Sequence, residues 1–377
     1  MKRRTFLLSA CVALPAYRLL FGHAASAHLP DYPSVAMGHP LTFPRDYGSH
    51  TDFRTEWWYV TGWLQVDAGT PMGFQVTFFR SRPALEEANP SRFAPRQLLF
   101  ANAALSDPRV GRALHDQRAA RSGFGLAQAS NANTDVHIDD WRLRRERDGR
   151  YRLDVATPQF GFALFMRPTH PLLLNGAAGY SRKGPLPAQA SYYYSEPGLA
   201  IEGVVKHSDG SEGKEEHVSG HAWLDHEWSS ELLAEEAVGW DWIGINLDDG
   251  GAVMAFQIRD QARHTFWAGG TVRTLDGRTQ SLSTESIRFT PLRWWRSEHT
   301  GARYPIAMRV DIGSVHLTLT PLMEDQEFDS RATTGAVYWE GAVVALDATA
   351  NAVAPNERKP VGRGYLELTG YYQRLEL

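Results

Sequence analysis

Short runs of alternating apolar and polar residues recur along most of the chain. Runs rich in aromatic and β-branched residues, separated by Gly, Pro, Asn and Asp, are typical of β-strands joined by turns. The predicted strands are residues 57–66, 73–79, 160–166, 200–205, 252–258, 309–319, 337–346 and 364–372. Helical periodicity is scarce, and only 229–237 and 84–88 are predicted as short helices. The pattern predicts an all-β protein, in which closed barrels would leave the fewest exposed strand edges.

Two parts of the sequence resemble two later parts. Residues 58–76 share seven identities with residues 240–258 when the chain is shifted by 182 positions without a gap. A second match pairs residues 220–225 with residues 362–367. Two matches in the same order indicate an internal duplication. We therefore expect two tandem β-barrel domains, covering residues 28–230 and 231–377.

The repeat separates residues that the fold explains from residues that need another reason. The ungapped match places Trp58 and Trp240 at equivalent positions, so the fold accounts for both. Asp225 has a counterpart in Glu367, which favours a structural hydrogen-bond acceptor that could also orient its neighbour. Four nearby residues have no counterpart in the second copy: Glu56, His226, Glu227 and Trp228.

Alternation along the predicted strand places His226 on the same face as Ala222 and Leu224. The second copy has Leu368 at this position, so the face is expected to point into the barrel. A histidine there is either a hydrogen-bonded core residue or a pocket residue that transfers protons. The sequence leaves both interpretations open.

Glu56 precedes three consecutive aromatic residues, 57–59. Burial among indole rings would raise the pKa of this carboxyl and make it a proton donor. The alternative is a glutamate at a strand end, in contact with solvent. The aromatic residues near these positions belong either to the core or to the wall of an apolar pocket. The predicted catalytic residues are Glu56, Asp225, His226 and Glu227, and the predicted ligand-binding residues are Trp57, Tyr59, Tyr193, Tyr194, Trp228 and Trp242.

Charge and motifs argue against several classes of protein. The net charge is −4 and no basic run carries interleaved aromatic residues, so nucleic-acid binding is not expected. The most basic stretch is 142–152, and the alternation of residues 141–155 around it is typical of a solvent-exposed hairpin. No Gly-x-Ser-x-Gly, His-Glu-x-x-His or glycine-rich phosphate motif occurs. His221 could join Asp225, His226 and Glu227 around a metal only if loops brought opposite strand faces together. We therefore expect neither a metal nor a cofactor.

The first 27 residues have the features of an export signal. Lys2–Leu7 matches the twin-arginine pattern, and Ala25–Ala27 offers a cleavage site. Cys11 is the only cysteine; it lies too close to the arginine pair for a lipoprotein signal and would leave with the signal peptide. No later run approaches the length of about 20 apolar residues that spans a bilayer. The sequence predicts a periplasmic protein without disulfides.

Three motifs together resemble one family: Thr55–Gly62, Gly73–Arg80 and Gly220–Trp228. The chain is similar, over about residues 36–372, to the carotenoid 1,2-hydratase (hydroxyneurosporene synthase) and AttH-like group. The resemblance implies two tandem lipocalin-like barrels. It also implies cofactor-independent acid/base addition of water to an isoprenoid double bond. At Glu227, however, the motif of the hydratases has an asparagine.

Two classes of function therefore remain. The first is a hydratase or lyase that acts on a hydrophobic, isoprenoid or lipid-like molecule. The second is a carrier without catalytic activity, or an accessory protein of an ABC-transporter permease, as exported members of the group suggest. A hydrolase is a weaker third possibility because no nucleophile motif is present. A pocket with Glu56 and His226 pointing into it would favour the enzyme, whereas a pocket of aromatic residues alone would favour the carrier.

Overall fold

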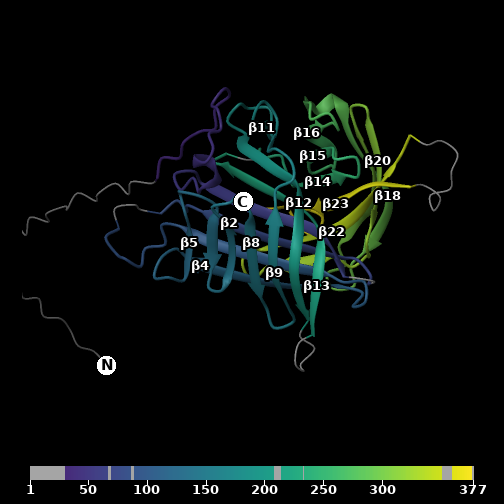
Figure 1. Cartoon of the computed structure of the whole chain (residues 1–377). Coiled ribbons are helices and arrows are strands. Elements are labelled where there is room, and N and C mark those ends of the chain that lie inside the picture. Colours follow the sequence, from purple (N-terminus) through teal and green to yellow (C-terminus); the bar gives the residue numbers. More distant parts are fainter. Residues whose placement is uncertain are drawn as a thin grey trace, which may run out of the picture.

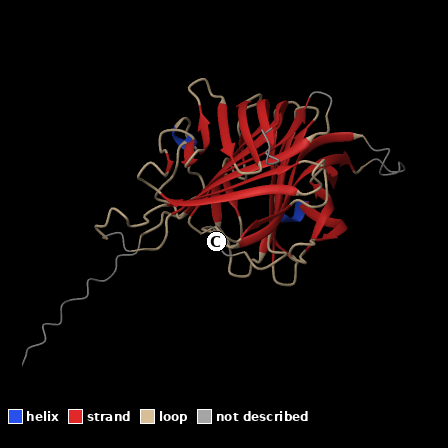
Figure 2. Ribbon diagram, turned by 90° about the horizontal axis from the view of Figure 1, so that it is seen from below, coloured by secondary structure: helices blue, strands red, loops and turns tan. Residues whose placement is uncertain are grey.

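The computed structural model describes residues 30–66, 69–85, 89–207, 214–231, 233–349 and 359–375. These residues form two β-sheets joined by loops, as Figure 1 and Figure 2 show. Their only helices are two single 3-10 turns, Arg45–Tyr47 and Thr284–Ser286. The all-β prediction is confirmed. No helix among them is long and apolar enough to cross a membrane. The predicted signal peptide and Cys11 lie outside the described residues, so export remains a prediction.

The first sheet curves into a nearly closed barrel around one apolar core. Its strands run in the order β4-β3-β2-β1-β13-β12-β9-β8-β7-β6-β5, with β10 and β11 paired to β12. Their bounds are β1 (Thr55–Val66), β2 (Met72–Ser81), β3 (Leu98–Ser106), β4 (Ala113–Arg121), β5 (Ala127–Ala129), β6 (Asp135–Ile138), β7 (Trp141–Arg145), β8 (Tyr151–Ala156), β9 (Phe160–Arg167), β10 (Leu173–Leu174), β11 (Tyr180–Arg182), β12 (Ala190–His207) and β13 (Lys214–Ser229).

The second sheet encloses a separate apolar core. Its strands run in the order β17-β16-β15-β14-β23-β22-β20-β19-β18, with β21 paired to β22. Their bounds are β14 (Gly239–Leu247), β15 (Ala252–Arg259), β16 (Thr265–Arg273), β17 (Thr279–Leu282), β18 (Ile287–Arg296), β19 (Arg303–Ile312), β20 (Val315–Pro321), β21 (Glu327–Ser330), β22 (Ala336–Asp347) and β23 (Pro360–Leu368). The molecule therefore has two tandem lipocalin-like barrels, as expected.

The two sheets repeat one topology. In each, the first strand lies between the second strand and the last, so β1 lies between β2 and β13, and β14 lies between β15 and β23. The match of residues 220–225 with 362–367 fits this arrangement, because Leu224 and Leu366 both face a barrel core. The duplication is thus visible in the order and the facing of the strands.

The ungapped match at 182 residues is wrong in its register. Trp58 lies in the core of the first barrel, whereas Trp240 packs on the outside of the second, between the barrels. Gly62 pairs with Ala222, and the matching residue of Ala222, Gly364, pairs with Ile245. The structural shift of the first strand is therefore 245 − 62 = 183. A slip of one residue moves every side chain to the other face of a strand, which explains the exchange of core and interface positions.

Three local predictions also need correction. The described residues of 229–237, which exclude 232, do not form a helix, because the β-ladder continues to Ser229, and its hydroxyl donates to the Ala190 carbonyl. Residues 84–85 are not helical, and 86–88 lie outside the described residues. The predicted strand 309–319 is a hairpin, because Gly313 turns the chain with a φ of 58°. The hairpin at 141–155 is confirmed by β7 and β8.

The barrels pack against each other through their first and last strands. A third apolar cluster joins Tyr59 and Trp223 of the first barrel to Trp242, Phe256 and Tyr365 of the second. The Trp63 indole donates a hydrogen bond to the Gly364 carbonyl across this contact, at 3.0 Å. The outer faces of β1, β13, β14 and β23 therefore meet, and the side chains on those faces share one environment.

Candidate functional site

A cavity of about 330 Å³ lies between the two barrels. Its size is at the lower end of the range for small-molecule pockets. Aromatic residues from both barrels form most of the wall: Trp57, Tyr59, Phe79, Phe100, Tyr193, Trp240, Trp242, Phe256 and Tyr338. Five carboxyl side chains also line it: Glu56, Asp225, Glu227, Glu340 and Glu367. A largely apolar wall with a few acidic groups is suited to acid/base chemistry on a hydrophobic molecule.

Strand alternation explains why the carboxyl groups meet. On β13, Leu224 and His226 point into the first barrel, so Asp225 and Glu227 point outward into the cavity. On β23, Leu366 and Leu368 point into the second barrel, so Glu367 points outward. Equivalent outer faces of the two barrels pack together. The matching acids Asp225 and Glu367 therefore line the same cavity.

Asp225 is buried and held in place by three donors. Its carboxylate accepts hydrogen bonds from Ser195 Oγ at 2.5 Å, Tyr193 Oη at 2.6 Å and Trp223 Nε1 at 2.6 Å. Burial raises the pKa of Asp225 to about 7, although these hydrogen bonds oppose it and the charge of Glu227 adds to it. The carboxyl can thus exchange a proton near neutral pH without changing its position.

The second barrel contributes two neighbouring carboxyl groups. Glu340 and Glu367 are paired residues of β22 and β23, on the same face of the sheet. Burial raises the pKa of Glu367 to about 7, and the charges of Asp225 and Glu227 contribute. Burial and the neighbouring Glu367 also raise the pKa of Glu340 well above its usual value. Both groups can hold a proton at neutral pH.

Lys183 is a site residue that the sequence did not reveal. Its Nζ lies 2.9 Å from Glu227 Oε1 and 3.0 Å from Ser181 Oγ. The same ammonium group lies 4.2 Å from the centre of the Phe256 ring. Among the described residues lining the cavity, the cationic ones are Lys183 and Arg80, and Arg80 is bonded to Glu56. Lys183 directly follows the short strand β11, and no local pattern in the sequence around it could have identified it.

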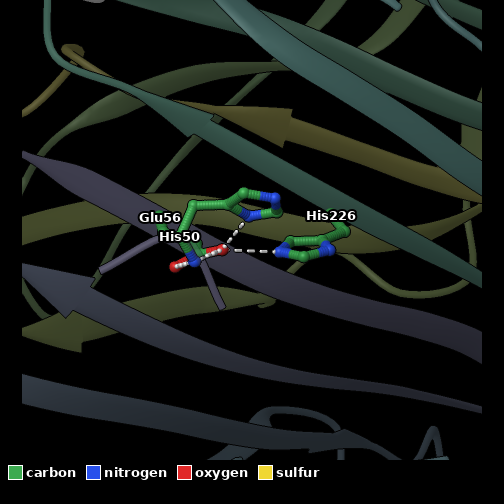
Figure 3. Close-up of side chains that lie close together, drawn as sticks. All are labelled: His50, Glu56 and His226. Carbon is green, nitrogen blue, oxygen red and sulfur yellow. Dashed lines mark hydrogen bonds and ion pairs between the residues drawn. The ribbon is translucent and has the colours of Figure 1, made fainter. Parts of the chain in front are cut away.

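His226 and Glu56 belong to a separate polar network inside the first barrel. Glu56 Oε1 lies 2.9 Å from His226 Nε2 and 2.9 Å from His50 Nδ1, as Figure 3 shows. Arg80 Nε donates to Glu56 Oε2 at 2.8 Å, and the Ser49 hydroxyl donates to the same oxygen at 2.7 Å. All these side chains are buried. Glu56 and Arg80 also border the cavity, but their polar atoms are occupied within the network.

The charges of this network balance. Burial alone would raise the pKa of Glu56, but the Arg80 charge and the hydrogen bonds from His226 and His50 hold it well below its usual value. Burial opposes the charged form of His50, yet its hydrogen bonds to Asp46 and Glu56 raise its pKa. Two carboxylates thus face the Arg80 guanidinium and the His50 ring, whose protonated form these partners favour. Glu56 is therefore an ionised acceptor, and the predicted rise of its pKa is wrong.

A neutral His226 ring is consistent with the charges of this network. Burial lowers the pKa of His226, and the hydrogen bond to Glu56 opposes the shift only in part. Its Nε2 can donate to Glu56 while its Nδ1, 3.0 Å from Tyr194 Oη, accepts the phenol proton. The ring also stacks on Trp58, with ring centres 4.7 Å apart. His226 is a hydrogen-bonded residue of the barrel interior and does not line the cavity.

The same three side chains have the composition of a metal site. The ligand atoms of His50, Glu56 and His226 lie within 4.8 Å of one another, and histidine and carboxylate are common zinc ligands. The second oxygen of Glu56 is bonded to Arg80, however, and His50 Nε2 lies 3.2 Å from Asp46. A divalent ion would have to displace protons from both rings and lie beside a guanidinium group. The arrangement favours an ion-pair network.

The predicted ligand-binding residues separate into two groups. Trp57, Tyr59, Tyr193 and Trp242 line the cavity, with the predicted acids Asp225 and Glu227. Tyr194 and Trp228 lie on the other side of the sheet, where Tyr194 contacts His226 and Trp228 stacks on His50 with ring centres 3.6 Å apart. The roles of all these residues remain predictions. The residues that sequence reasoning missed are His50, Arg80, Lys183, Glu340 and Glu367. Two of them carried a signal: Glu367 is the counterpart of Asp225, and Arg80 ends the motif Gly73–Arg80.

Comparisons with known proteins agree with the fold. The crystal structure of a protein assigned as AttH from Nitrosomonas europaea is 50% identical, covers 90% of this chain and 100% of its own, and superimposes with a TM-score of 0.82. Kievitone hydratase from Nectria haematococca is 16% identical and covers 92% of this chain and 98% of its own, with a TM-score of 0.64, so it shares the fold. No curated protein matches the chain significantly. The AttH-like family model matches residues 34–371, and the protein therefore belongs to the AttH-like family.

Proposed function

We propose that the protein adds water to a carbon–carbon double bond of a hydrophobic molecule bound between the two barrels, or removes water in the reverse reaction. One observation carries the proposal. Asp225 and Glu367, at matching positions of the two barrels, line one aromatic cavity, and the pKa of each is raised to about 7. Two carboxyl groups that titrate near neutral pH can supply one acid and one base.

The proposed reaction balances without an oxidant or reductant. The protonated carboxyl gives its proton to one carbon of the double bond, and positive charge develops on the other carbon. Aromatic faces such as those of Trp242 and Tyr193 stabilise that charge in a site with little water. A water molecule attacks the cationic carbon, and the ionised carboxyl accepts its proton. The product has gained H and OH, and the two carboxyl groups have exchanged protonation states.

Other residues of the cavity hold these groups in position. Tyr193 links the barrels, because its hydroxyl donates to Asp225 and accepts from Trp242 Nε1 at 3.1 Å. Lys183 neutralises Glu227, so Glu227 adds a counter-charge near Asp225 and is not the proton donor. We assign His226 and Glu56 to the support of β1 and β13 from the other side of the sheet. The hydratase activity in the name of the Nectria relative is compatible with this chemistry on the same fold.

The alternative is a carrier that binds the same kind of molecule without reaction. The aromatic wall favours it as much as it favours an enzyme, since nine aromatic side chains line the cavity. The buried carboxyl groups favour the enzyme, because an apolar carrier gains nothing from acids whose burial costs free energy. A periplasmic location is part of the proposal and rests on the sequence of residues 1–27 alone.

Isotope labelling tests the proposal. Purified protein is incubated in H₂¹⁸O with isoprenoid alkenes, and hydrated products are detected by mass spectrometry. Asp225→Asn and Glu367→Gln should each lower product formation by about 10²- to 10⁴-fold, the usual contribution of a general acid or base. Asp154→Asn, on the exposed face of β8, serves as the control and should leave the rate unchanged. Full activity in both cavity variants would contradict the assignment, and binding without any labelled product would favour the carrier.

A further inference from the structure

A groove on the outside of the second barrel combines arginine and aromatic side chains. It is lined by residues 300–302 and by Arg263, Trp294, Arg303, Tyr371 and Tyr372. Arg303 Cζ lies 5.5 Å from the centre of the Trp294 ring. In the same way, Arg263 Cζ lies 5.6 Å from the centre of the Tyr371 ring. Such cation–π contacts hold an arginine side chain in place but leave its N–H donors free for an anion.

Positive charge predominates along β18 and the turn that follows it. Residues 287–303 carry one glutamate, Glu298, and four arginines, Arg288, Arg293, Arg296 and Arg303, although the net charge of the whole chain is −4. Arg296 and Arg303 are direct partners across β18 and β19, and like charges at paired positions destabilise a sheet. In the described part of the chain, Arg263, Arg296 and Arg303 form no ion pair. An anionic group from outside the chain would supply the missing counter-charge.

The strand β18 also exposes two large apolar side chains. Leu292 is 54% exposed and Trp294 is 39% exposed. The register of β18 with β19 shifts between Pro291 and Arg293 and again between Arg293 and Trp295. Bulges change the direction of nearby side chains, and here Leu292 and Trp294 are exposed while Trp295 packs against the barrel core. Exposed tryptophan and leucine beside arginine are typical of surfaces that lie in the headgroup region of a membrane.

The same strand is protected against pairing with a strand of a second copy. β18 stands at the end of the strand order of the second sheet, where a free edge could accept another strand. Pro291 has no N–H to donate, and the two register shifts interrupt the regular ladder. A lipid surface needs no strand ladder and attracts arginine by charge. These features favour a membrane over a second protein chain as the occupant.

The C-terminal segment connects the groove to the cavity between the barrels. Tyr371 and Tyr372 line the groove, whereas Thr369 and Leu375 line the cavity. The Tyr371 hydroxyl donates to the buried carboxylate of Asp241 at 3.0 Å, which fixes this segment on the second barrel. A lipid surface at the groove would therefore lie beside the segment that lines the cavity.

We propose that this groove, together with Leu292 and Arg296, is a docking surface for membranes that contain anionic phospholipids. Arg263, Arg296 and Arg303 bind headgroup phosphates, and Leu292 and Trp294 enter the region between the headgroups and the acyl chains. Binding is reversible and weakens with salt, because it rests on a few arginines and a small apolar area. This docking does not depend on the hydration reaction, since a carrier would use the same surface.

Vesicle sedimentation tests the docking surface. The full-length protein is mixed with vesicles of phosphatidylcholine alone or of phosphatidylcholine with phosphatidylglycerol. Binding to the anionic vesicles should be at least about ten times tighter and should fall as NaCl is added. Soluble glycerol phosphate carries the same anionic group without acyl chains and should not displace the protein at the concentration of the lipid. Equal binding to both vesicles would overturn the inference, and displacement by glycerol phosphate would indicate a site for a free phosphate compound instead.

Arg303→Gln is the sharpest variant. It should weaken binding to the anionic vesicles by about five-fold, which corresponds to about 1 kcal/mol per arginine at a membrane surface. Its melting temperature should equal or slightly exceed that of wild type, because a like-charge pair with Arg296 is removed. Arg293→Gln is the matched control, since Arg293 lies on the same strand but is paired with Glu324, and its binding should stay within about two-fold of wild type. All variants keep the same N-terminal residues, so a difference between them comes from β18 and β19. Equal losses in both variants would contradict the docking surface.

Trp294→Ser tests the apolar part of the contact. Phe165→Ser is its control, because Phe165 is 36% exposed and also lies beside two arginines, Arg150 and Arg152. Each of those arginines is paired with an aspartate, so that surface lacks the unbalanced charge. Trp294→Ser should weaken binding several-fold, and Phe165→Ser should leave it unchanged. Unchanged binding of Trp294→Ser would contradict insertion of β18 into the membrane surface.

Discussion

The two faces of β13 both carry buried polar side chains, but the charges that surround these side chains differ. On the inner face, His226 joins a network in which two carboxylates face the His50 ring and the Arg80 guanidinium, and each hydrogen bond has a donor and an acceptor. On the outer face, Asp225 lies in the cavity with Glu227, Glu340 and Glu367, and the nearby cation, Lys183, is paired with Glu227. On the inner face, positive and negative charges balance, whereas on the outer face the carboxyl groups outnumber the cations.

This difference determines which groups can transfer protons. The pKa of Glu56 is held low by Arg80 and the histidines despite burial, so Glu56 stays ionised. The pKa values of Asp225 and Glu367 rise to about 7 because burial and neighbouring acids act without a compensating cation. Burial alone therefore does not identify a catalytic acid. The balance of charge around the buried group decides between a structural ion pair and a proton donor.

The second barrel supports a structural role for the inner network. Asp241 on β14 is buried and accepts a hydrogen bond from Arg259 Nε on β15, at 3.1 Å. In the first barrel, Glu56 on β1 accepts from Arg80 on β2 in the same way. Both pairs join the first two strands of a barrel on its inner face. A buried carboxylate–arginine pair thus recurs in both copies, which is expected of a feature that stabilises the fold.

The largest expected effect comes from breaking one of these pairs. Arg80→Met leaves Glu56 as a buried carboxylate without its main counter-ion and should destabilise the protein by about 3–5 kcal/mol. Arg259→Met should cost a similar amount if the pairs are equivalent. Urea unfolding followed by circular dichroism measures both. A loss below about 1 kcal/mol in Arg80→Met would show that the inner network is not a stabilising ion pair.

The pH dependence of stability tests the raised pKa of a cavity carboxyl group. The pKa of Glu367 is about 7 in the folded protein against an ordinary value of 4.5, so the folded state holds the proton more tightly. Its contribution to stability is complete below pH 4.5 and is lost as the pH rises through about 7. Between about pH 4 and pH 8, wild type should lose about 3 kcal/mol more unfolding free energy than Glu367→Gln. Parallel profiles would contradict the raised pKa.

His226→Leu should have the smallest of the three effects. Although Leu368 occupies the matching position of the second barrel, His226 has hydrogen bonds to Glu56 and Tyr194 that leucine cannot replace. We expect a loss of about 1–3 kcal/mol, because two buried polar groups lose a partner, while the affinity for isoprenoid alkenes stays within about two-fold. Thermal melting and fluorescence titration measure the two quantities. Unchanged stability together with abolished turnover would contradict the structural role and indicate that His226 is a catalytic residue.

The features that depend on local periodicity could be predicted from the sequence. Alternation along residues 220–228 separated Leu224 and His226 from Asp225 and Glu227, and the match with residues 362–367 assigned each face its direction. These predictions held because a strand presents every second side chain to the same side, whatever surrounds it. The ungapped match at 182 residues failed for the same reason, since a shift of one position exchanges the two faces.

Which of these residues meet depends on how the two barrels pack, and the sequence pattern does not contain that information. Because both copies carry an acid at this position, the repeat favours a structural role for Asp225 and Glu367. The structure brings them into one cavity, because the barrels pack through equivalent faces. Arg80, His50 and Lys183 reach their carboxylates from other segments of the chain. A pKa depends on burial and on the charges within a few ångströms, and these come from residues as distant in sequence as Asp225 and Glu367, so no local pattern could have assigned the proton donors.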